Sequence, residues 1–375
     1  MLARKRTDNC GGHYKRPPTA DHTHSLPCLI GSFIHDITNA NWGSQLFQKY
    51  ELGTLPSKPS SMSATFSGST LSITVLDNGK SISFSVSINN RPPGSGTHPA
   101  IINYGPLGGL PIPSGVAIIN FSNDDIAQEQ GQSSRGKGKF YDLYGSGHSA
   151  GALTAWAWGV SRIIDALELT KAQTNIDPVR IGVTGCSRNG KGALVAGALE
   201  PRIALTLPEE SGAGGSSCWR IATWQKNRGD NVQESKQIIQ ENVWFSPNFN
   251  QHVNNIDSLP FDHHLLAGLI APRPIYIMEN VDMEWLGKIS TYGCMGIARK
   301  QWQALGALDR FGYSQVGGNS HCSFPSSQQG SELNAFIGKY LLNNPNAGGT
   351  SIFRSTQNHN FNLDSWSPWT VPNIL

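Results

Sequence analysis

The feature that most constrains the fold is an alternation of short apolar strands with helical segments in the second half of the chain. Buried strands are indicated at 178–185, 202–212 and 273–280, and helices at 191–199 and 287–308. Strands joined by helices pair in parallel, and such sheets are covered on both faces. The order of these segments predicts an α/β protein with a mostly parallel central sheet.

The preceding segments add an antiparallel part. Residues 63–89, "SATFSGSTLSITVLDNGKSISFSVSIN", alternate apolar and polar side chains, with breaks at Ser-Gly and Asn-Gly. This pattern predicts an antiparallel meander, because Asn-Gly favours a tight hairpin turn. Other patterns indicate an amphipathic helix at 44–56, strands at 98–106 and 115–122, a buried helix at 151–169 and a last helix at 336–342.

The 375 residues fit a single α/β domain. Residues 1–42 are polar and rich in His, Pro and Arg, so we expect a poorly ordered tail there and one catalytic domain over 43–375. The first residues are charged and lack the apolar segment of a signal peptide, so no export signal is expected in them. Because no apolar run reaches the roughly 18 residues that cross a membrane, we expect no membrane span.

Charge and cysteine spacing exclude several kinds of partner. The net charge is only +3, and no basic stripe follows the first 16 residues, which argues against binding nucleic acid. The six cysteines form no Cys-x-x-Cys pair, so a zinc ribbon is not expected, while disulfides and buried free thiols both stay open. His263 and His264 are adjacent and would point about 100° apart on a helix. We therefore expect no metal and no cofactor.

Two serines compete for the role of nucleophile. "GHSAG" at 147–151 matches Gly-x-Ser-x-Gly, but a polar stretch with glycines precedes it where a strand is needed. A nucleophilic serine sits on a sharp turn between a strand and a helix, whose N-terminus faces the developing oxyanion. "VRIGVTGCSRNGKGALVAGAL" supplies strand, turn and helix, although Asn189 stands where the second Gly would be. We predict Ser187 as the nucleophile and place Ser149 in the first turn of a helix.

The string "GCSRNGKGA" resembles the nucleophile motif of the glucuronoyl esterases, carbohydrate esterase family 15, whose signature is Gly-Cys-Ser-Arg-x-Gly-Lys. The resemblance runs from about Trp42 to the C-terminus and includes "LFQKYELGTLP", "PEESGAGGSSCWR", "MEWLGKIS" and "NSHCSFP", but not the first 40 residues. It implies an α/β-hydrolase fold, which is a three-layer αβα sandwich, and an activity on esters of 4-O-methyl-D-glucuronic acid.

A serine nucleophile needs a base and a carboxylate that orients the base. His321 follows the last long helix in a Gly/Ser-rich loop, where the chain order serine, acid, histidine places the base, and the resemblance implies the same residue. Glu210 and Asp282 both lie at the C-terminal ends of predicted strands, so their positions leave the acid open. The resemblance implies Glu210, and we expect Glu209 beside it to be a solvated neighbour.

Arg188 directly follows the predicted nucleophile. Its backbone N–H is a standard oxyanion donor, and its guanidinium can add a charge-assisted bond, a double role that the resemblance also implies. A cation in the first turn of a helix is otherwise unfavourable, which favours a functional reason for an arginine at position 188. Hydroxyl groups need donors and acceptors, and the apolar face of a sugar needs an aromatic ring. The resemblance implies such a sugar-binding set, namely Lys191, Gln233, Glu241 and Trp285.

The same resemblance implies how the cysteines pair, with the disulfides Cys186–Cys322 and Cys218–Cys294. The first bond would join the neighbours of the predicted nucleophile and base. Cys10 and Cys28 lie in the unmatched tail, and the sequence supports no prediction about whether they pair. Asn120 begins the glycosylation sequon "NFS", which matters only in an exported chain. By resemblance we expect a secreted protein.

The residue patterns predict a metal-free serine esterase that acts through an acyl-enzyme intermediate. The resemblance implies its substrate, the ester between 4-O-methyl-D-glucuronic acid side chains of glucuronoxylan and lignin alcohols, and we expect a monomer. An acetyl-xylan or feruloyl esterase on the same fold is an alternative, and a wide apolar pocket in place of the sugar-binding set would favour it. A catalytically inactive carbohydrate-binding protein is a second alternative, against which the intact serine, histidine and acid argue.

Overall fold

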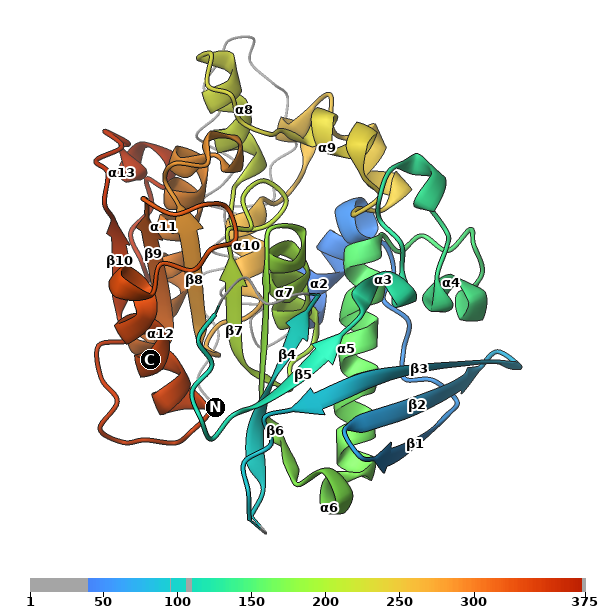
Figure 1. Ribbon diagram of the computed structural model, residues 1–375. Coiled ribbons are helices and arrows are strands. Elements are labelled where there is room, and N and C mark those ends of the chain that lie inside the picture. The colour runs from blue at the N-terminus through green and yellow to red at the C-terminus, as the bar shows by residue number, and fades with distance from the viewer. Residues whose placement is uncertain (1–39, 95, 106–109, 373–375) are drawn as a thin grey trace, which may run out of the picture.

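The computed structural model describes residues 40–94, 96–105 and 110–372. They contain a ten-stranded sheet with the order β1-β2-β3-β5-β4-β6-β7-β8-β9-β10 (Figure 1). The strands are β1 (Ser61–Ser67), β2 (Thr70–Asp77), β3 (Lys80–Asn89), β4 (His98–Tyr104), β5 (Ala117–Phe121), β6 (Ile176–Cys186), β7 (Ile203–Glu209), β8 (Ile275–Asn280), β9 (Phe311–Val316) and β10 (Ile352–Ser355). The predicted tail lies outside the described residues, apart from its last three positions, which begin helix α2 (Ala40–Phe47).

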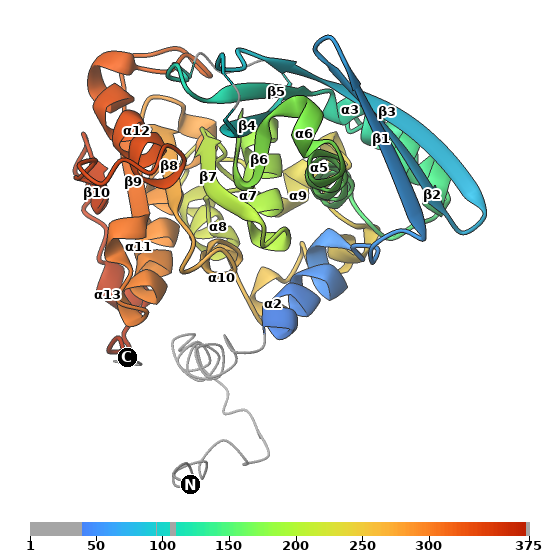
Figure 2. The ribbon, with the colours of Figure 1, turned by 90° about the horizontal axis from the view of Figure 1, so that it is seen from below.

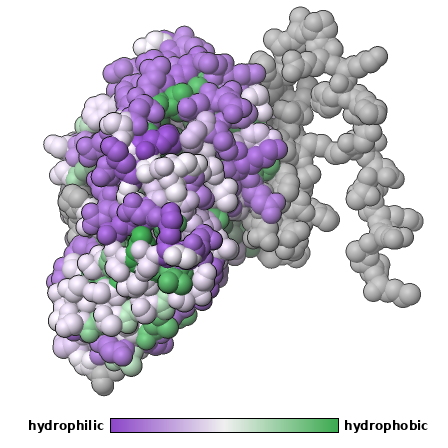
Figure 3. Space-filling model, turned by 90° about the vertical axis from the view of Figure 1, so that its right-hand side faces the viewer, coloured by the Kyte–Doolittle hydropathy of each residue, from purple (hydrophilic) through white to green (hydrophobic). Residues whose placement is uncertain are grey.

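The first three strands form the antiparallel meander that the alternating pattern predicts. Asn78 and Gly79 join β2 to β3 with positive φ angles of 50° and 72°, which a two-residue hairpin turn of this kind requires. The outward positions of β1 and β2 are mostly serine and threonine, whereas Leu71, Ile73 and Val75 are buried. These uncharged hydroxyl side chains give the lower part of the face in Figure 3 its pale colour.

From β5 to β10 every neighbouring pair of strands is parallel, which confirms the mostly parallel sheet. The sequence patterns miss β9 and β10. Strand β9, "FGYSQV", is fully buried but carries Ser314 and Gln315 in its centre, so it shows no apolar run. The Gln315 amide donates to the backbone oxygen of Lys288 at 3.0 Å, which makes burial of this polar side chain tolerable.

Helices cover both faces of the sheet (Figure 2), as a three-layer sandwich requires. Helix α12 (Ser326–Tyr340) packs Leu333, Phe336 and Ile337 against one face, while α5 (Ala152–Leu169), α7 (Arg188–Leu199) and α11 (Lys288–Ala304) lie on the other. Helix α12 begins ten residues before the predicted start at 336, because its first turns are polar. No helix in the described ranges is long and apolar enough to cross a membrane.

The remaining helical segments form the connections. They are η2 (Gln48–Leu52), α3 (Asn123–Ile126), η3 (Gln132–Ser134), α4 (Lys139–Tyr144), α6 (Lys171–Thr174), α8 (Trp219–Asn227), α9 (Ser235–Glu241), η4 (Pro247–Gln251), η5 (Ile256–Ser258), α10 (His263–Gly268), η6 (Glu284–Leu286), η7 (Leu308–Arg310) and α13 (Leu363–Trp366). Helices α8 and α9 lie beyond the C-terminal ends of β7 and β8, at the top of Figure 1. In open α/β sheets that edge is where ligands bind.

Candidate active site

Ser187 occupies a sharp turn between β6, which ends at Cys186, and α7, which begins at Arg188. Its backbone has φ 60° and ψ −124°, a conformation that an L-residue adopts only under strain. The backbone N–H of Ser187 donates to the oxygen of Glu209 at 3.0 Å, which fastens the turn to β7. Strand, strained turn and helix are thus all present, and the N-terminus of α7 faces the space above the turn.

Two glycines allow the helix to start so close to the sheet. A Cβ atom at Gly185 would lie 2.6 Å from the backbone oxygen of Asn189, and one at Gly190 would lie 2.4 Å from that of Glu209. The Asn189 side chain accepts a hydrogen bond from Asn123 at 3.1 Å. The second glycine is therefore needed at position 190, one residue later than in Gly-x-Ser-x-Gly.

Ser149 has none of this context. It lies in a bend three residues before α5, not in the first helical turn as predicted. Its hydroxyl bonds to the Thr54 hydroxyl at 3.2 Å and accepts from the Thr54 backbone N–H at 3.1 Å. The better match to the sequence pattern is thus a loop serine that bridges two segments.

His321 and Glu210 form a directly bonded pair. The distance from His321 Nδ1 to Glu210 Oε2 is 2.5 Å, and the carboxylate is buried while the imidazole is about one quarter exposed (28%). This bond places the proton of the neutral imidazole on Nδ1, which leaves Nε2 as the acceptor for a hydroxyl proton.

Further donors hold the Glu210 carboxylate in place. The side chains of Asn280 and Asn319 donate to Oε1 at 3.3 and 3.1 Å, and the backbone N–H of Cys322 donates to Oε2 at 3.1 Å. Asp282, the alternative acid, accepts instead from the backbone N–H of Gly318 at 2.7 Å. The sequence offered no signal for the two asparagines, because they come from β8 and a distant loop.

Backbone strain marks the same residues. Eight described residues other than glycine have positive φ, and five of them are asparagines, which tolerate this region. The other three are Ser187 (φ 60°), Glu210 (φ 43°) and Cys322 (φ 60°). Residues in such conformations cluster at functional sites, where the surrounding structure holds them.

The structure contains both expected disulfides, Cys186–Cys322 and Cys218–Cys294. The first joins residues whose Cα atoms lie 5.6 Å apart, and it ties the Ser187 turn to the His321 loop. Cys186, His321 and Cys322 form the one group in the described ranges compact enough for a metal, with ligand atoms within 4.8 Å, but both sulfurs are bonded to each other. Disulfides are typical of proteins from oxidising compartments.

Arg188 points its guanidinium toward a buried acid that the sequence analysis missed. Its Nη1 atom lies 2.5 Å from Oε1 of Glu129, and the Arg188 side chain is about half exposed. The second carboxylate oxygen of Glu129 accepts from the indole N–H of Trp244 at 2.7 Å. This ion pair offsets the cost of a cation in the first turn of a helix.

Lys191 is almost fully buried one turn further along α7. Its ammonium donates to the backbone oxygen of Ser211 at 2.7 Å and lies 4.8 Å from the centre of the Trp244 ring. Burial lowers the pKa of Lys191 to about 8, although the charge of Glu279 acts in the opposite direction.

Glu209 is buried, which contradicts the expectation of a solvated neighbour. It is 1% exposed, and neither carboxylate oxygen has a hydrogen-bond partner in the described structure. Burial, followed by the charges of Glu210 and Glu279, raises the pKa of Glu209 to about 9, so it is a neutral acid at pH 7. Glu279 on β8 accepts from the hydroxyls of Ser211 and Ser216, and burial raises its pKa to about 7.

Two of the predicted sugar-binding residues meet beside the base. The Trp285 ring stands edge-on to the His321 ring with centroids 5.6 Å apart, and its backbone oxygen accepts from the Gln233 N–H at 3.0 Å. Trp285 is 40% exposed, as a wall that meets substrate would be. Glu241 ends α9, is exposed, and accepts from Gln237; no bond in the described structure joins it to the other predicted residues.

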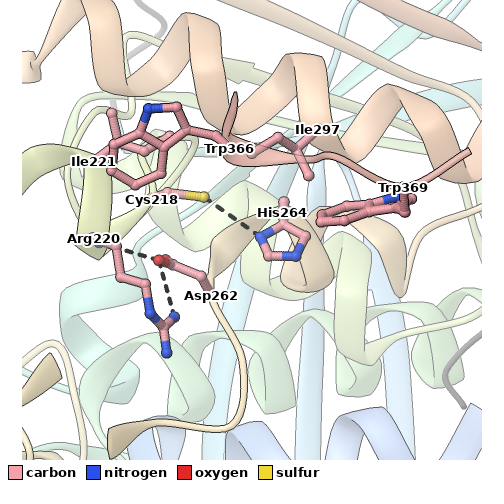
Figure 4. Close-up of a pocket in the computed structure, with 8 residues that line it drawn as sticks. All are labelled: Cys218, Arg220, Ile221, Asp262, His264, Ile297, Trp366 and Trp369. Atoms are coloured by element: carbon pink, nitrogen blue, oxygen red, sulfur yellow. Dashed lines mark hydrogen bonds and ion pairs between the residues drawn. The ribbon is translucent and has the colours of Figure 1, made fainter. Parts of the chain in front are cut away.

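The adjacent histidines are both buried, and their side chains have different partners. His263 bonds to Glu51 at 2.6 Å and to the oxygen of Gly215 at 2.7 Å. His264 lies against Cys218 in a narrow pocket beside the second disulfide (Figure 4), and burial lowers its pKa to about 4. The pocket is lined by Cys218, Arg220, Ile221, Asp262, His264, Ile297, Trp366 and Trp369, none of them predicted for catalysis or sugar binding.

Asn120 lies in β5, a strand that is paired on both sides. Its amide nitrogen donates to the Ser87 hydroxyl at 3.2 Å. A glycan on this nitrogen would have to share or break that bond. Glycosylation at Asn120 stays a prediction.

Comparison with known proteins fits this geometry. A family described as "Glucuronyl esterase, fungi" matches residues 73–306. The chain is 80% identical over 333 residues to the 4-O-methyl-glucuronoyl methylesterase of Podospora anserina, covering 88% of this chain and 69% of that protein.

Two solved structures share the fold. The glucuronoyl esterase catalytic domain of Hypocrea jecorina superposes with a TM-score of 0.86 at 55% identity, covering 90% of this chain and 91% of that one. A serine-to-alanine mutant of the Sporotrichum thermophile glucuronoyl esterase, in complex with methyl 4-O-methyl-beta-D-glucopyranuronate, gives a TM-score of 0.85 at 50% identity, covering 88% and 89%. This chain belongs to the fungal glucuronyl esterase family and is a carboxylic ester hydrolase.

Proposed function

We propose that this protein is a serine esterase that hydrolyses esters of 4-O-methyl-D-glucuronic acid, with Ser187, His321 and Glu210 as its catalytic triad. The observation that carries the proposal is the bonded Glu210–His321 pair, which a disulfide ties to a strained serine turn. A relative of 50% identity was crystallised with a methyl ester of this sugar acid. Lys191 follows the Ser187 turn on α7, and Trp285 stands against His321, so a cation and an aromatic ring are available for a sugar acid.

We propose a two-step mechanism for these residues. His321 Nε2 takes the Ser187 proton as the hydroxyl attacks the uronoyl carbonyl, and Glu210 stabilises the imidazolium that forms. The Arg188 backbone N–H and guanidinium stabilise the oxyanion. The imidazolium then protonates the leaving alcohol, which gives an acyl-enzyme on Ser187. Water, deprotonated by His321, releases the free uronic acid and restores the serine.

We propose the sugar contacts residue by residue. Lys191 supplies a buried donor, Trp285 an aromatic wall beside the base, and Gln233, next to Trp285, a side chain with both donor and acceptor. Glu241 would reach the sugar from the exposed end of α9. The natural substrate would be glucuronoxylan esterified to lignin alcohols, and the protein would act as an exported monomer, for which the two disulfides are suitable.

The substrate proposal is tested by comparing three esters at equal concentration. These are methyl 4-O-methyl-glucuronate, acetylated xylan and p-nitrophenyl acetate. We expect kcat/KM to be highest for the glucuronate ester. Preferential hydrolysis of the acetate esters would instead identify an acetyl esterase on this fold.

A further inference from the structure

Glu129 has no part in the mechanism above, yet it contacts two of the groups that line the site. It lies between α3 and η3, and its carboxylate is 1% exposed. One oxygen accepts from Arg188 at 2.5 Å and the other from the Trp244 indole at 2.7 Å. Its backbone oxygen accepts from the Val243 N–H at 3.2 Å. Glu129 therefore joins the start of α7 to the segment that follows α9.

The guanidinium of Arg188 needs such an anchor. Its side chain is 47% exposed and stands in the first turn of α7, where the helix dipole disfavours a cation. An arginine side chain that is free at a surface samples many rotamers, so in only a small fraction of molecules does its guanidinium point at any one atom. A short charge-assisted bond from one Nη atom to a buried carboxylate fixes the plane of the group, while the remaining N–H groups stay available.

Glu129 also acts on Lys191 through Trp244. The indole N–H points at Glu129, and the ring lies 4.8 Å from the Lys191 ammonium. The bond to Glu129 therefore sets the orientation of the ring against which Lys191 packs. A single buried anion thus orients the environment of two cations on consecutive turns of α7.

We propose that Glu129 is a positioning residue for the esterase reaction: it holds the Arg188 guanidinium where the oxyanion develops. This inference rests on the proposed function, in which Arg188 is an oxyanion donor. Glu129 touches neither the reacting ester nor Ser187 in this scheme, so any effect on kcat must pass through a neighbouring group, and the proposal assigns that role to Arg188. That requirement separates it from a residue that only supports the fold.

The test is a double-mutant cycle with Glu129→Gln and Arg188→Ala, measured on methyl 4-O-methyl-glucuronate and on p-nitrophenyl acetate. Removing an oxyanion donor costs about 10²–10³ in kcat, so Arg188→Ala should fall in that range. Glu129→Gln keeps the shape but weakens the bond, and we expect kcat to fall roughly tenfold with KM within about twofold. In the Arg188→Ala background the same change should alter kcat by less than about twofold.

Glu200→Gln is the matched control, because Glu200 is also buried and bonds an arginine, Arg202, at 2.7 Å at the other end of the same helix. It should leave kcat unchanged. Equal losses from Glu129→Gln in both Arg188 backgrounds, or no loss in either, would overturn the inference. If Glu129→Gln does not fold, Glu129→Asp, which keeps the charge but shortens the side chain, serves in the same cycle.

The two substrates separate this inference from the proposed function. An enzyme that turns over only p-nitrophenyl acetate would refute the glucuronate substrate. The cycle on the acetate ester would still decide the role of Glu129, because oxyanion stabilisation is needed for both esters.

Discussion

Glu209→Gln should change how the stability of the protein depends on pH. Among the described residues of the folded protein, the Glu209 carboxyl finds no hydrogen-bond partner. Burial, with the charges of Glu210 and Glu279, raises its pKa from 4.5 to about 9. In the unfolded chain it ionises near pH 4.5. Between these values the folded state holds one proton more than the unfolded state. The free energy of unfolding therefore falls as pH rises through this window.

The size of the effect follows from the same shift. One pKa unit corresponds to about 1.4 kcal/mol, so from pH 5 to pH 7 this single group lowers the free energy of unfolding by about 2.5 kcal/mol. Glutamine has nearly the same shape but does not titrate. The substitution should remove this 2.5 kcal/mol from the pH dependence, whatever constant change in stability the new amide brings.

Urea unfolding of the oxidised protein at pH 5 and pH 7 measures the difference directly. Glu241→Gln, an exposed change of the same kind, is the control. From pH 5 to pH 7 the free energy of unfolding should fall by about 2.5 kcal/mol more in the wild type than in Glu209→Gln. It should fall by the same amount in the wild type and in Glu241→Gln. Equal losses in wild type and Glu209→Gln would show that Glu209 is ionised or solvated, and would refute the reasoning.

Three further predictions concern the site. Glu210→Gln should lower kcat by at least about 10³-fold, by analogy with loss of the orienting acid in other triads, whereas Asp282→Asn should lower it less than about tenfold. Steady-state kinetics that show the larger loss of kcat for Asp282→Asn would contradict the assignment of Glu210 as the acid. KM of the wild type should rise as pH increases through about 8, where Lys191 loses its charge, and this rise should be absent in Lys191→Met. If the pH profiles of KM were the same for wild type and Lys191→Met, a charged Lys191 would be excluded from substrate binding. Replacing Cys186 and Cys322 together by serine should lower kcat and the melting temperature, because the bond closes a loop between residues 136 positions apart; unchanged kinetics would mean that the two loops hold themselves in register.

Much of the architecture could be predicted because local patterns and tertiary structure agree. The meander, the parallel sheet and the strand–turn–helix at Ser187 each have a strong local signal. Strand β9 was missed because the buried Ser314 and Gln315 interrupt its apolar pattern. The Gln315 amide donates to the backbone of Lys288 on α11, and Gln329 on α12 donates to the backbone oxygen of Ser314, partners that no local pattern reveals. Burial of polar groups is set by such distant partners.

The active site shows the same contrast between residues with a local sequence signal and residues that depend on distant partners. The strand–turn–helix pattern located Ser187, chain order and the resemblance located His321, and the resemblance favoured Glu210 over Asp282. The structure brings Glu210 and His321 into contact, and a disulfide between their neighbours ties the Ser187 turn to the His321 loop. Asn280 and Glu129 were missed, because each acts only through a side chain that is distant in sequence. Glu209 was misjudged because charged residues at strand ends are usually solvated, whereas this one is 1% exposed on a strand that is paired with both β6 and β8.

The central claim is that Ser187, and not Ser149, performs ester hydrolysis on a glucuronate substrate. The most direct measurement is the rate of acid release from methyl 4-O-methyl-glucuronate by wild type, Ser187→Ala and Ser149→Ala. We expect Ser187→Ala to lose at least about 10³-fold in kcat while its melting temperature is retained, and Ser149→Ala to stay within about twofold of wild type. Activity retained in Ser187→Ala, or lost in a folded Ser149→Ala, would contradict the claim.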